Sequence, residues 1–429
     1  MKLLIKNGLI LQPGGRGVTD ELDILIEDYK VKKIDRDIVN EDALIIDAKN
    51  KLVVPGLIDV HVHFREPGQE YKENIYTGSC AAVSGGFTTV IAEPNTNPPI
   101  DTASRLKNVL EIAREQSLVH FFSKACISKR IDGKRLVNVP QLKQAGAKAL
   151  SDDGQPVASN KLMRNALIKG KEYDILITPH CEESELYRQR MIEKLGRQFA
   201  LLEPYTAEDR FIERDIKLAE ETDANIHISH VSLASSVKKI AQAKKRGVKI
   251  TAEATPHHFI LSKENEKEIG TNAKVNPPLR AKEDVEAIKE GLSNGIIDII
   301  ASDHAPHTPA EKTVPWEQAP FGIIGLETTL GLVLTYLVKP GILTLKQAIE
   351  KMTILPAKIF GLAEAGFGTL TPNISTDITI IDLEKKWKVD VDKFYSKGRN
   401  CPFNGWELQG KATTVIVKGQ VMMKDGDIL

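Results

Sequence analysis

Short runs of apolar, often β-branched residues recur through the middle of the chain, and stretches with helical character separate most of them. Strands that alternate with helices predict parallel βαβ units, and eight such strands fit a closed (β/α)8 TIM barrel. A doubly wound open sheet is the alternative. The eight runs are GLIDVHVH (56–63), TTVIAEP (88–94), HFFSKACI (120–127), AKALSDD (147–153), DILITPHC (174–181), ANIHISHVS (224–232), VKITAEATPHH (248–258) and DIIASDHAP (298–306).

The two ends of the chain have a different pattern. Residues 1–55 contain short alternating pieces such as LLIKNGLIL, and the last part of the chain repeats this style in TTVIVKGQVMMKDGDIL. Such pieces, broken by Gly, Asp and Asn, are typical of β-hairpins. The 429 residues suffice for one large and one small domain. We therefore expect an α/β protein in which residues 56–365 form the barrel, while residues 1–55 and 366–429 together form a small β domain.

Charge and apolar content argue against several classes of protein. The 58 basic and 58 acidic residues cancel, so nothing in the net charge favours nucleic acid or an anionic membrane as a partner. We find no signal peptide and no apolar run near the roughly 20 residues of a membrane helix. Cys80, Cys126, Cys181 and Cys401 are scattered without a C-x-x-C spacing. This usage indicates a reducing, cytoplasmic environment.

Polar side chains lie at the ends of the predicted strands. In a barrel of this kind the carboxyl ends of the strands carry the chemistry. We expect these residues to converge, although they are far apart in the sequence. They are His61 and His63 on the first strand, Asp152 and Asp153 on the fourth, His180 on the fifth, His230 on the sixth, and Asp303 with His304 on the eighth.

The first of these strands ends in HVHFR. Residues i and i+2 of a strand face the same side, so His61 and His63 can bind one ion, and Arg65 can continue that edge toward a ligand. Imidazole with carboxylate suits Zn, and also Mn, Fe or Co. A pair of satisfied core histidines is the alternative for His61 and His63 taken alone. The histidines and aspartates at the other strand ends favour the metal site.

The other histidines have different expected positions. His120 begins an apolar strand, which predicts a structural role. Regular alternation places His227 and the histidine at the end of its strand on opposite faces, so we expect His227 to pack outside the barrel. Metal ligation by His257 or its neighbour is possible but not favoured. His304 should point away from the adjacent aspartate and support the site from behind, and His307 is a candidate for substrate contact in the following loop.

Several motifs together resemble the amidohydrolase superfamily and, within it, the longer, type I dihydroorotases. They occur in the family's order and span nearly the whole chain, including the β-rich ends. The resemblance implies a (β/α)8 barrel with a metal centre at the strand ends. The motifs are GLIDVHVHFREPGQEYKENIYTGSCAAVSGGFTTVIAEPNTNPP, SDDGQPV, PHCEE, ISHVS, ATPHH, NPPLR, SDHAPH and PFGIIGLET.

The resemblance also implies a role for individual residues. One or two Zn²⁺ ions would be bound, with Asp153 bridging the two sites and Asp303 acting both as ligand and as catalytic proton shuttle. The implied metal ligands are His61, His63, Asp153, His180, His230 and Asp303. The implied substrate contacts are Arg65, Asn95 and His307 for a carboxylate, and Asn276 with the backbone of Phe321 and Gly322 for a ring.

The activity implied by the resemblance is the reversible hydrolysis of the cyclic amide of (S)-dihydroorotate to N-carbamoyl-L-aspartate, a step of pyrimidine (UMP) biosynthesis. The residue types suit this chemistry. A metal ion lowers the pKa of water from about 16 to about 7 and polarises the attacked carbonyl. An aspartate can carry the proton to the leaving nitrogen, and the planar fork of an arginine matches a carboxylate.

The chain departs from the family pattern at Glu93, where relatives usually carry an apolar residue. A second question is the bridging ligand, because hydantoinases, allantoinases and shorter dihydroorotases use a carboxylated lysine. Lys148 lies on the same predicted strand as Asp153, but roughly 16 Å away at about 3.3 Å per residue and on the opposite face. We therefore expect Asp153 to be the bridge.

Other functions and partners remain open at this point. The alternatives are a hydantoinase or allantoinase-like cyclic amidohydrolase, and a non-catalytic scaffold, which typically loses metal ligands that this chain keeps. Type I relatives often work with aspartate transcarbamoylase, so the resemblance implies a possible separate transcarbamoylase chain and a homo-oligomer.

Overall fold

Eight short strands form the centre of the molecule. The computed structural model describes residues 2–13, 17–182, 207–374 and 377–429. Within these ranges the central strands pair in parallel as two arcs, β6-β7-β8 and β13-β12-β11-β10-β9. Their bounds are β6 (Leu57–Val62), β7 (Phe87–Ala92), β8 (His120–Ser123), β9 (Ala149–Leu150), β10 (Leu176–Ile177), β11 (Ile226–Ile228), β12 (Ile250–Ala254) and β13 (Ile299–Ile300).

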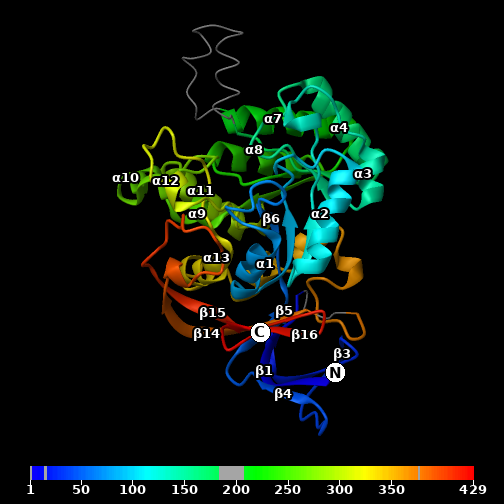
Figure 1. The fold of residues 1–429 in the computed structure, drawn as a ribbon, viewed down its shortest axis with the longest axis vertical. Coiled ribbons are helices and arrows are strands. Elements are labelled where there is room, and N and C mark those ends of the chain that lie inside the picture. The colour runs from blue at the N-terminus through cyan, green and yellow to red at the C-terminus, as the bar shows by residue number, and fades with distance from the viewer. Residues whose placement is uncertain (1, 14–16, 183–206, 375–376) are drawn as a thin grey trace.

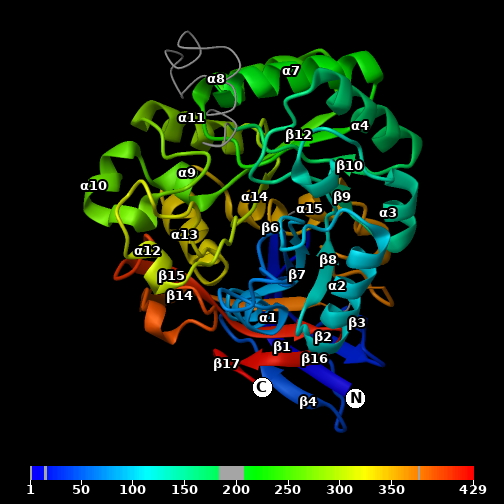
Figure 2. The same cartoon turned by 45° about the horizontal axis from the view of Figure 1, so that its top comes forward.

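Two isolated parallel bridges join the arcs into a ring. Ala125 pairs with Leu150 between the ends of β8 and β9, and Val62 pairs with His304 between β6 and the segment after β13. The backbone N–H of His63 also donates to the carbonyl of His304 over 2.8 Å. The ring confirms the predicted (β/α)8 barrel and excludes the open sheet. Figure 2 shows these strands with helices around them.

Helices cover the outside of the barrel and follow most of its strands. Helix α2 shows why such segments form: the Thr102 side chain caps its N-terminus by accepting from the Arg105 N–H, and a stripe at Leu106, Val109 and Ala113 is buried. The helices are α1 (Ile75–Ser84), α2 (Ala103–Gln116), α3 (Val139–Ala145), α4 (Asn160–Glu172), α7 (Ala207–Thr222), α8 (Ala234–Lys245), α9 (Pro256–Ile260), α10 (Glu266–Ile269), α11 (Lys282–Ser293), α12 (Pro309–Lys312), α13 (Leu326–Val333), α14 (Leu345–Glu350) and α15 (Ile354–Ile359).

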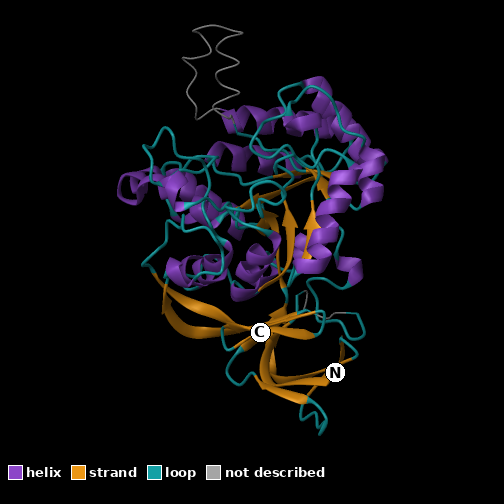
Figure 3. Cartoon of the chain, viewed as in Figure 1, coloured by secondary structure: helices purple, strands orange, loops and turns teal. Residues whose placement is uncertain are grey.

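Strands from both ends of the chain form one sheet below the barrel (Figures 1 and 3). Its order is β17-β16-β15-β14-β5-β1-β2-β3, with β4 beside β1, so N-terminal β5 lies between C-terminal β14 and N-terminal β1. The strands are β1 (Lys2–Leu11), β2 (Val18–Glu27), β3 (Lys30–Asp35), β4 (Leu44–Asp47), β5 (Leu52–Pro55), β14 (Ile378–Lys388), β15 (Glu407–Val417), β16 (Gln420–Lys424) and β17 (Asp427–Ile428). The predicted association of the two ends is confirmed.

Apolar side chains fill the lower part of the barrel. Ile58, Ile91, Ala149 and Ile299 belong to one buried cluster with Phe360, which follows α15. The alternate residues of the strands contribute to the larger cluster beneath the helices. The polar strand ends therefore lie above a layer of buried apolar side chains. No helix in the described ranges is both long and apolar enough to cross a lipid bilayer.

Candidate metal centre and active site

The HVH segment brings two imidazoles to the top of β6. The pairing of β6 with β7 is irregular between Asp59 and Val62, which changes the simple alternation of the strand just before the site. Nε2 of His63 lies 3.0 Å from Oδ1 of Asp303, and Nε2 of His61 lies 3.6 Å from the same oxygen. His61, His63 and Asp303 form one compact group of possible metal ligands, and all three are buried.

Asp153 connects this group with the histidines of the next strands. Its Oδ1 lies 3.5 Å from Nε2 of His61, 3.4 Å from Nδ1 of His180 and 3.6 Å from Nε2 of His230. His61, Asp153 and His230 form a second compact group. The two imidazole nitrogens of His180 and His230 are 3.0 Å apart. The structure therefore brings together all six residues predicted as ligands.

The hydrogen bonds of the two β6 histidines suit a metal ion. Nδ1 of His61 donates to Glu253 over 2.6 Å, and Nδ1 of His63 donates to Asn95 over 2.9 Å. In this tautomer each Nε2 carries a lone pair directed into the site. Nε2 of His61 is buried and has no hydrogen-bond partner. Imidazoles combined with carboxylates are a donor set for zinc and similar divalent ions.

Charges in the site reinforce one another. Burial acts to lower the pKa of His61, but Glu93, Glu253 and Asp303 outweigh burial and raise this pKa well above its usual range. Burial acts to raise the pKa of Asp303, but His61 and His63 outweigh it and lower this pKa. The group thus favours positive charge at the imidazoles and negative charge at the carboxylates. A divalent cation can take the place of the protons.

Three residues of the site have left-handed backbone conformations. The φ angles are 60° at Arg65, 33° at His230 and 49° at Asp303. Such angles are uncommon for residues other than glycine, and they cluster at functional sites because the surrounding structure must hold them. At His230 and Asp303 the change of direction comes where the strand ends, and it turns the side chain toward the centre of the ring.

The backbone at His230 explains why one prediction is wrong. His227 does not pack outside the barrel: its Nε2 donates to Glu253 over 3.0 Å, and Nδ1 lies 2.8 Å from the Thr251 hydroxyl. Ile226 and Ile228 belong to the larger apolar cluster between the strands and the outer helices. Because side chains alternate along a strand, His227 between them points into the barrel. The left-handed turn at His230 then breaks that alternation, and both histidines point into the barrel.

Glu253, on β12, is a functional residue that the sequence analysis missed. It is fully buried, and its two carboxylate oxygens bind the rings of His61 and His227. Burial acts to raise the pKa of Glu253, but His61 and His227 lower it well below its usual range. The alternation in KITAEA placed a carboxylate on the inner face of a strand that ends at the site. That pattern was a signal by which Glu253 could have been found.

Glu93, the departure from the family pattern, has a partner that explains its burial. Lys124, just after β8, forms an ion pair with Oε1 of Glu93, and both side chains are fully buried. The same oxygen lies 3.6 Å from Nε2 of His61. Burial acts to lower the pKa of Lys124, but Glu93 and Glu253 raise it. A fixed ammonium therefore lies beneath the candidate metal centre.

A cavity of about 290 Å³ opens beside the candidate ligands. Asn95, which follows β7, fixes one wall: besides accepting from His63, it donates to Oδ2 of Asp153 over 2.9 Å. Nδ2 of Asn276 lies 3.1 Å from Nε2 of His180. The lining residues are His63, Arg65, Asn95, Asp153, Gly154, Gln155, His180, Asn276, Asp303, Ala305, Phe321 and Gly322. Gly154, Gln155 and Ala305 were not anticipated from the sequence.

Arg65 lines one end of this cavity, and His307 lies against Arg65. Nε of Arg65 donates to the Pro306 carbonyl over 3.2 Å, and its Nη2 lies 3.3 Å from Nε2 of His307. Nε2 of His307 is also 2.8 Å from the carbonyl oxygen of Phe321. Burial, together with Arg65 and nearby lysines, lowers the pKa of His307 to about 3. A neutral imidazole beside a guanidinium suits an anionic ligand.

The segment that carries Phe321 approaches the strand ends closely. Gly322 has φ of 124°, and a Cβ there would come within 2.8 Å of the Ala305 Cβ, so a side chain is excluded. The Gly322 N–H donates to the Lys274 carbonyl over 2.9 Å, and its carbonyl accepts from Asn400 over 3.0 Å. These contacts fix the position of this wall of the cavity.

The four remaining histidines lie outside the candidate ligand groups. Nδ1 of His304 accepts from the Gly325 N–H over 3.2 Å, so its ring points away from Asp303 as expected. His120 lies 3.0 Å from Asp377 and joins the barrel to the β sheet. Burial and His258 lower the pKa of His257 well below its usual range.

The comparisons with known proteins define the family. The model of the amidohydrolase family matches residues 52–422. The chain therefore belongs to the amidohydrolase family, whose members are metal-dependent, and it is a hydrolytic enzyme.

Curated relatives and solved structures narrow the comparison. The dihydroorotase of Acetivibrio thermocellus is 44% identical over 431 residues, covering 100% of both chains. The dihydroorotase of Pelotomaculum thermopropionicum is 45% identical over 429 residues, covering 99% of each. Among solved structures, the L-hydantoinase (dihydropyrimidinase) from Arthrobacter aurescens has a TM-score of 0.89 at 29% identity and covers 100% of this chain and 97% of its own. The dihydropyrimidinase from Brevibacillus agri has a TM-score of 0.88 at 25% identity, with coverage of 100% and 96%.

Proposed function

We propose that this enzyme is a dihydroorotase, which hydrolyses the cyclic amide of (S)-dihydroorotate reversibly to N-carbamoyl-L-aspartate in pyrimidine biosynthesis. The observation that carries the proposal is the identity of 42–45% with curated dihydroorotases over nearly the whole chain. A small cavity with Arg65 at one end, next to His307, and the candidate ligands at the other supports it, because the substrate has a carboxylate and a cyclic amide.

The proposed metal is zinc, as one or two ions per subunit. The ligands would be His61, His63, Asp153, His180, His230 and Asp303, with Asp153 between the two sites. A bound zinc ion supplies an acidified water and polarises the amide carbonyl. The unpartnered Nε2 of His61 supports this assignment.

The proposed binding residues hold the substrate by its carboxylate. The Pro306 carbonyl fixes Nε of Arg65, and the terminal amino groups of the guanidinium would bind the carboxylate oxygens. Asn95 and His307 would complete this contact. Asn276 and the Phe321–Gly322 backbone would position the ring, since both line the same cavity. The cyclic amide would then face Asp303.

Asp303 is the proposed proton carrier. As the water oxygen bonds to the carbonyl carbon, a carboxylate oxygen of Asp303 would accept the water's proton. When the ring C–N bond breaks, the same oxygen would deliver that proton to the leaving nitrogen. Oδ1 of Asp303 lies 3.0 Å from Nε2 of His63 and 3.6 Å from Nε2 of His61, so this carboxylate is at the place where the proposed metal and its water would be held.

A hydantoinase-like activity is the second candidate, because the similar solved structures include hydantoinases and dihydropyrimidinases. Hydantoin and allantoin have no ring carboxylate, so they would leave Arg65 without an anionic partner. The purified enzyme should be assayed with dihydroorotate, hydantoin and allantoin, and its metal content measured in parallel. Preference for hydantoin or allantoin would reject the proposed substrate. Absence of hydrolysis of all three compounds by the metal-loaded enzyme would reject both candidate activities.

The organisation of the enzyme in the cell is a further part of the proposal. We assign catalysis to a barrel domain of residues 56–365, with 1–55 and 366–429 as the β domain. We also propose that the enzyme forms a homo-oligomer and that it binds a separate aspartate transcarbamoylase chain. Sedimentation of the enzyme alone tests the first proposal, and sedimentation after mixing with the transcarbamoylase tests the second. A cytoplasmic location is supported by Cys80, Cys126, Cys181 and Cys401, which are all free and buried.

A further inference from the structure

A second cavity lies at the end of the barrel opposite the candidate metal centre. It has a volume of about 450 Å³ and is formed by the segments that lead into β9, β10, β11 and β12, together with the end of α15. None of its lining residues lines the cavity beside the metal ligands. We call it the basal pocket. Its lining is Lys143, Gly146, Ala147, Lys148, Gly170, Lys171, Asp174, Ile175, Leu176, Asp223, Asn225, Lys249, Lys358, Ile359, Phe360 and Gly361.

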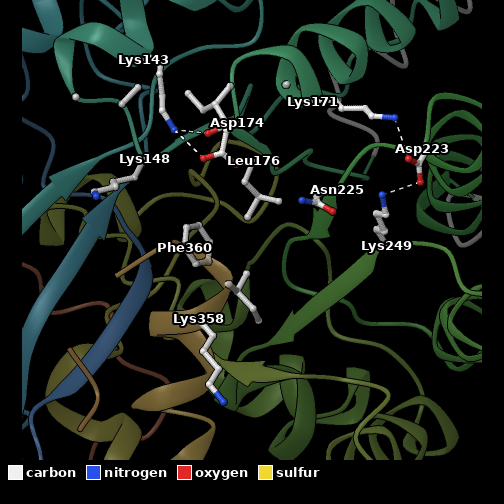
Figure 4. A pocket seen from close by; sticks show the side chains of 16 residues that line it. Lys143, Lys148, Lys171, Asp174, Leu176, Asp223, Asn225, Lys249, Lys358 and Phe360 are labelled. Carbon is white, nitrogen blue, oxygen red and sulfur yellow. Dashed lines mark hydrogen bonds and ion pairs between the residues drawn. The ribbon is translucent and has the colours of Figure 1, made fainter. Parts of the chain in front are cut away.

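Positive charge exceeds negative charge around the basal pocket. Its lining includes five lysines but two aspartates. Asp223 pairs with both Lys171 and Lys249, at 2.8 and 2.7 Å, and so leaves one of those charges uncompensated. Figure 4 shows these pairs on one side of the pocket.

Lys148 and Lys358 add charge that no carboxylate balances within the part of the chain that the structure describes (Figure 4). Lys148 is half-buried, and its ammonium lies 4.8 Å from the centre of the Phe122 ring. Burial and the nearby Lys143 lower the pKa of Lys148. Bringing an anion into the pocket would relieve this repulsion. Lys249 and Lys358 are exposed, so added salt screens these charges.

Apolar groups form the other part of the lining. In Figure 4, Leu176 and Phe360 lie between Lys148 on one side and the group of Lys171, Asp223 and Lys249 on the other. A lining that combines lysines with an aromatic ring suits a ligand with an anionic end and a planar, less polar end. The volume lies within the range of about 300–1000 Å³ that is usual for small-molecule sites.

We propose that the basal pocket binds a nucleoside phosphate, with the phosphates on Lys148, Lys249 and Lys358 and the base against the apolar side chains of Leu176, Ile359 and Phe360. The basal pocket is separate from the candidate metal centre, since the buried apolar cluster that contains Phe360 lies between them. On the metal-centre side, the Phe360 ring packs edge-on against His227, with ring centres 5.4 Å apart.

Calorimetric titration of the full-length, metal-loaded enzyme tests this proposal with three probes: ADP, inorganic pyrophosphate and adenosine. ADP should bind saturably and more weakly as salt is added, and adenosine should not bind, because the phosphates carry most of the attraction. Pyrophosphate should bind more weakly than ADP. Pyrophosphate that bound as tightly as ADP would overturn the contact between base and Phe360. No saturable binding of ADP at millimolar concentration would overturn the site itself.

Charge-neutral variants locate the binding. The double variant Lys148→Met/Lys358→Met should bind ADP at least about tenfold more weakly, since hydrogen bonds to charged groups are the stronger ones. The matched control Lys107→Met/Lys385→Met removes two exposed lysines outside both cavities and should bind like the parent. Equal affinity of both double variants would place ADP elsewhere and overturn the proposal.

Chemical labelling gives a readout that needs no variant. Pyridoxal phosphate combines an anionic group with an aldehyde that forms an imine with a neutral lysine amine, and borohydride makes the product permanent. Peptide mapping should find the label on lysines of the basal pocket, foremost Lys148, and ADP should protect them. Labelling that ADP does not reduce would contradict the proposal.

Discussion

Glu253 accepts a hydrogen bond from the ring of His61, since its Oε1 lies 2.6 Å from Nδ1 of that histidine. The other ring nitrogen of His61, Nε2, faces Asp153 and Asp303. A carboxylate in this position fixes the ring and its tautomer and increases the basicity of the nitrogen that binds a metal. The second oxygen of Glu253 binds His227, so the carboxylate is itself fixed.

The first prediction concerns this contact. Glu253→Gln removes the charge that supports His61, and we expect metal affinity to fall by about 10–100-fold. Competition with a chromophoric chelator measures the affinity, and circular dichroism checks the fold. The exposed Glu290→Gln is a matched control and should retain the parent affinity. Unchanged metal affinity in the Glu253 variant would show that His61 does not depend on this carboxylate.

Asp303→Asn tests the proton carrier. The amide cannot accept the proton of the attacking water, so turnover of dihydroorotate should fall by at least about a hundredfold. Metal content measured on the same sample separates loss of the proton carrier from loss of a ligand. Near-normal turnover with the metal bound would remove Asp303 from the mechanism.

Arg65→Lys tests recognition of the carboxylate. The change keeps the positive charge but loses the planar fork and the contact with Pro306, so KM for dihydroorotate should rise about tenfold or more. Steady-state kinetics measures KM and kcat separately. If neither value changes, the substrate carboxylate binds elsewhere in the cavity.

The identity of the bridging ligand is tested with two alanine variants. Asp153→Ala should lose metal, because this carboxylate lies within 3.4–3.6 Å of four histidines. Lys148→Ala should keep its metal, since Lys148 lines the basal pocket at the opposite end of the barrel. Elemental analysis of both proteins gives the answer. Loss of metal from the Lys148 variant, with rescue by short carboxylic acids, would point to a carboxylated lysine instead.

The buried pair of Glu93 and Lys124 should matter for stability. Lys124→Met leaves the Glu93 carboxylate buried without its partner, and we expect the free energy of unfolding to fall by about 3–5 kcal/mol. The double variant Glu93→Met/Lys124→Met should recover most of this loss, because neither charge is then buried alone. Chemical denaturation of the three proteins measures the coupling. Equal stability of the single and double variants would show that the two charges do not depend on each other.

The sequence by itself determined the barrel strands and the residues at their ends. Local stereochemistry is sufficient for this: alternation, β-branched runs and helix caps depend on neighbours in the chain. The carboxyl ends of barrel strands meet at one face, which is why the six candidate ligands could be expected to converge. The resemblance of the motifs to a known family added the cavity residues Asn95 and Asn276 and a binding role for Arg65.

Only the tertiary structure decided which buried groups support one another. Glu253 and His61 are 192 positions apart, and their contact exists because the ring of strands closes. The left-handed turn at His230 placed it and His227 on the same side, which regular alternation does not predict. The pairing of Glu93 with Lys124 depends likewise on the packing of β7 beside β8. Such contacts require that each carboxylate have a definite neighbour in space, and local sequence patterns do not contain that information.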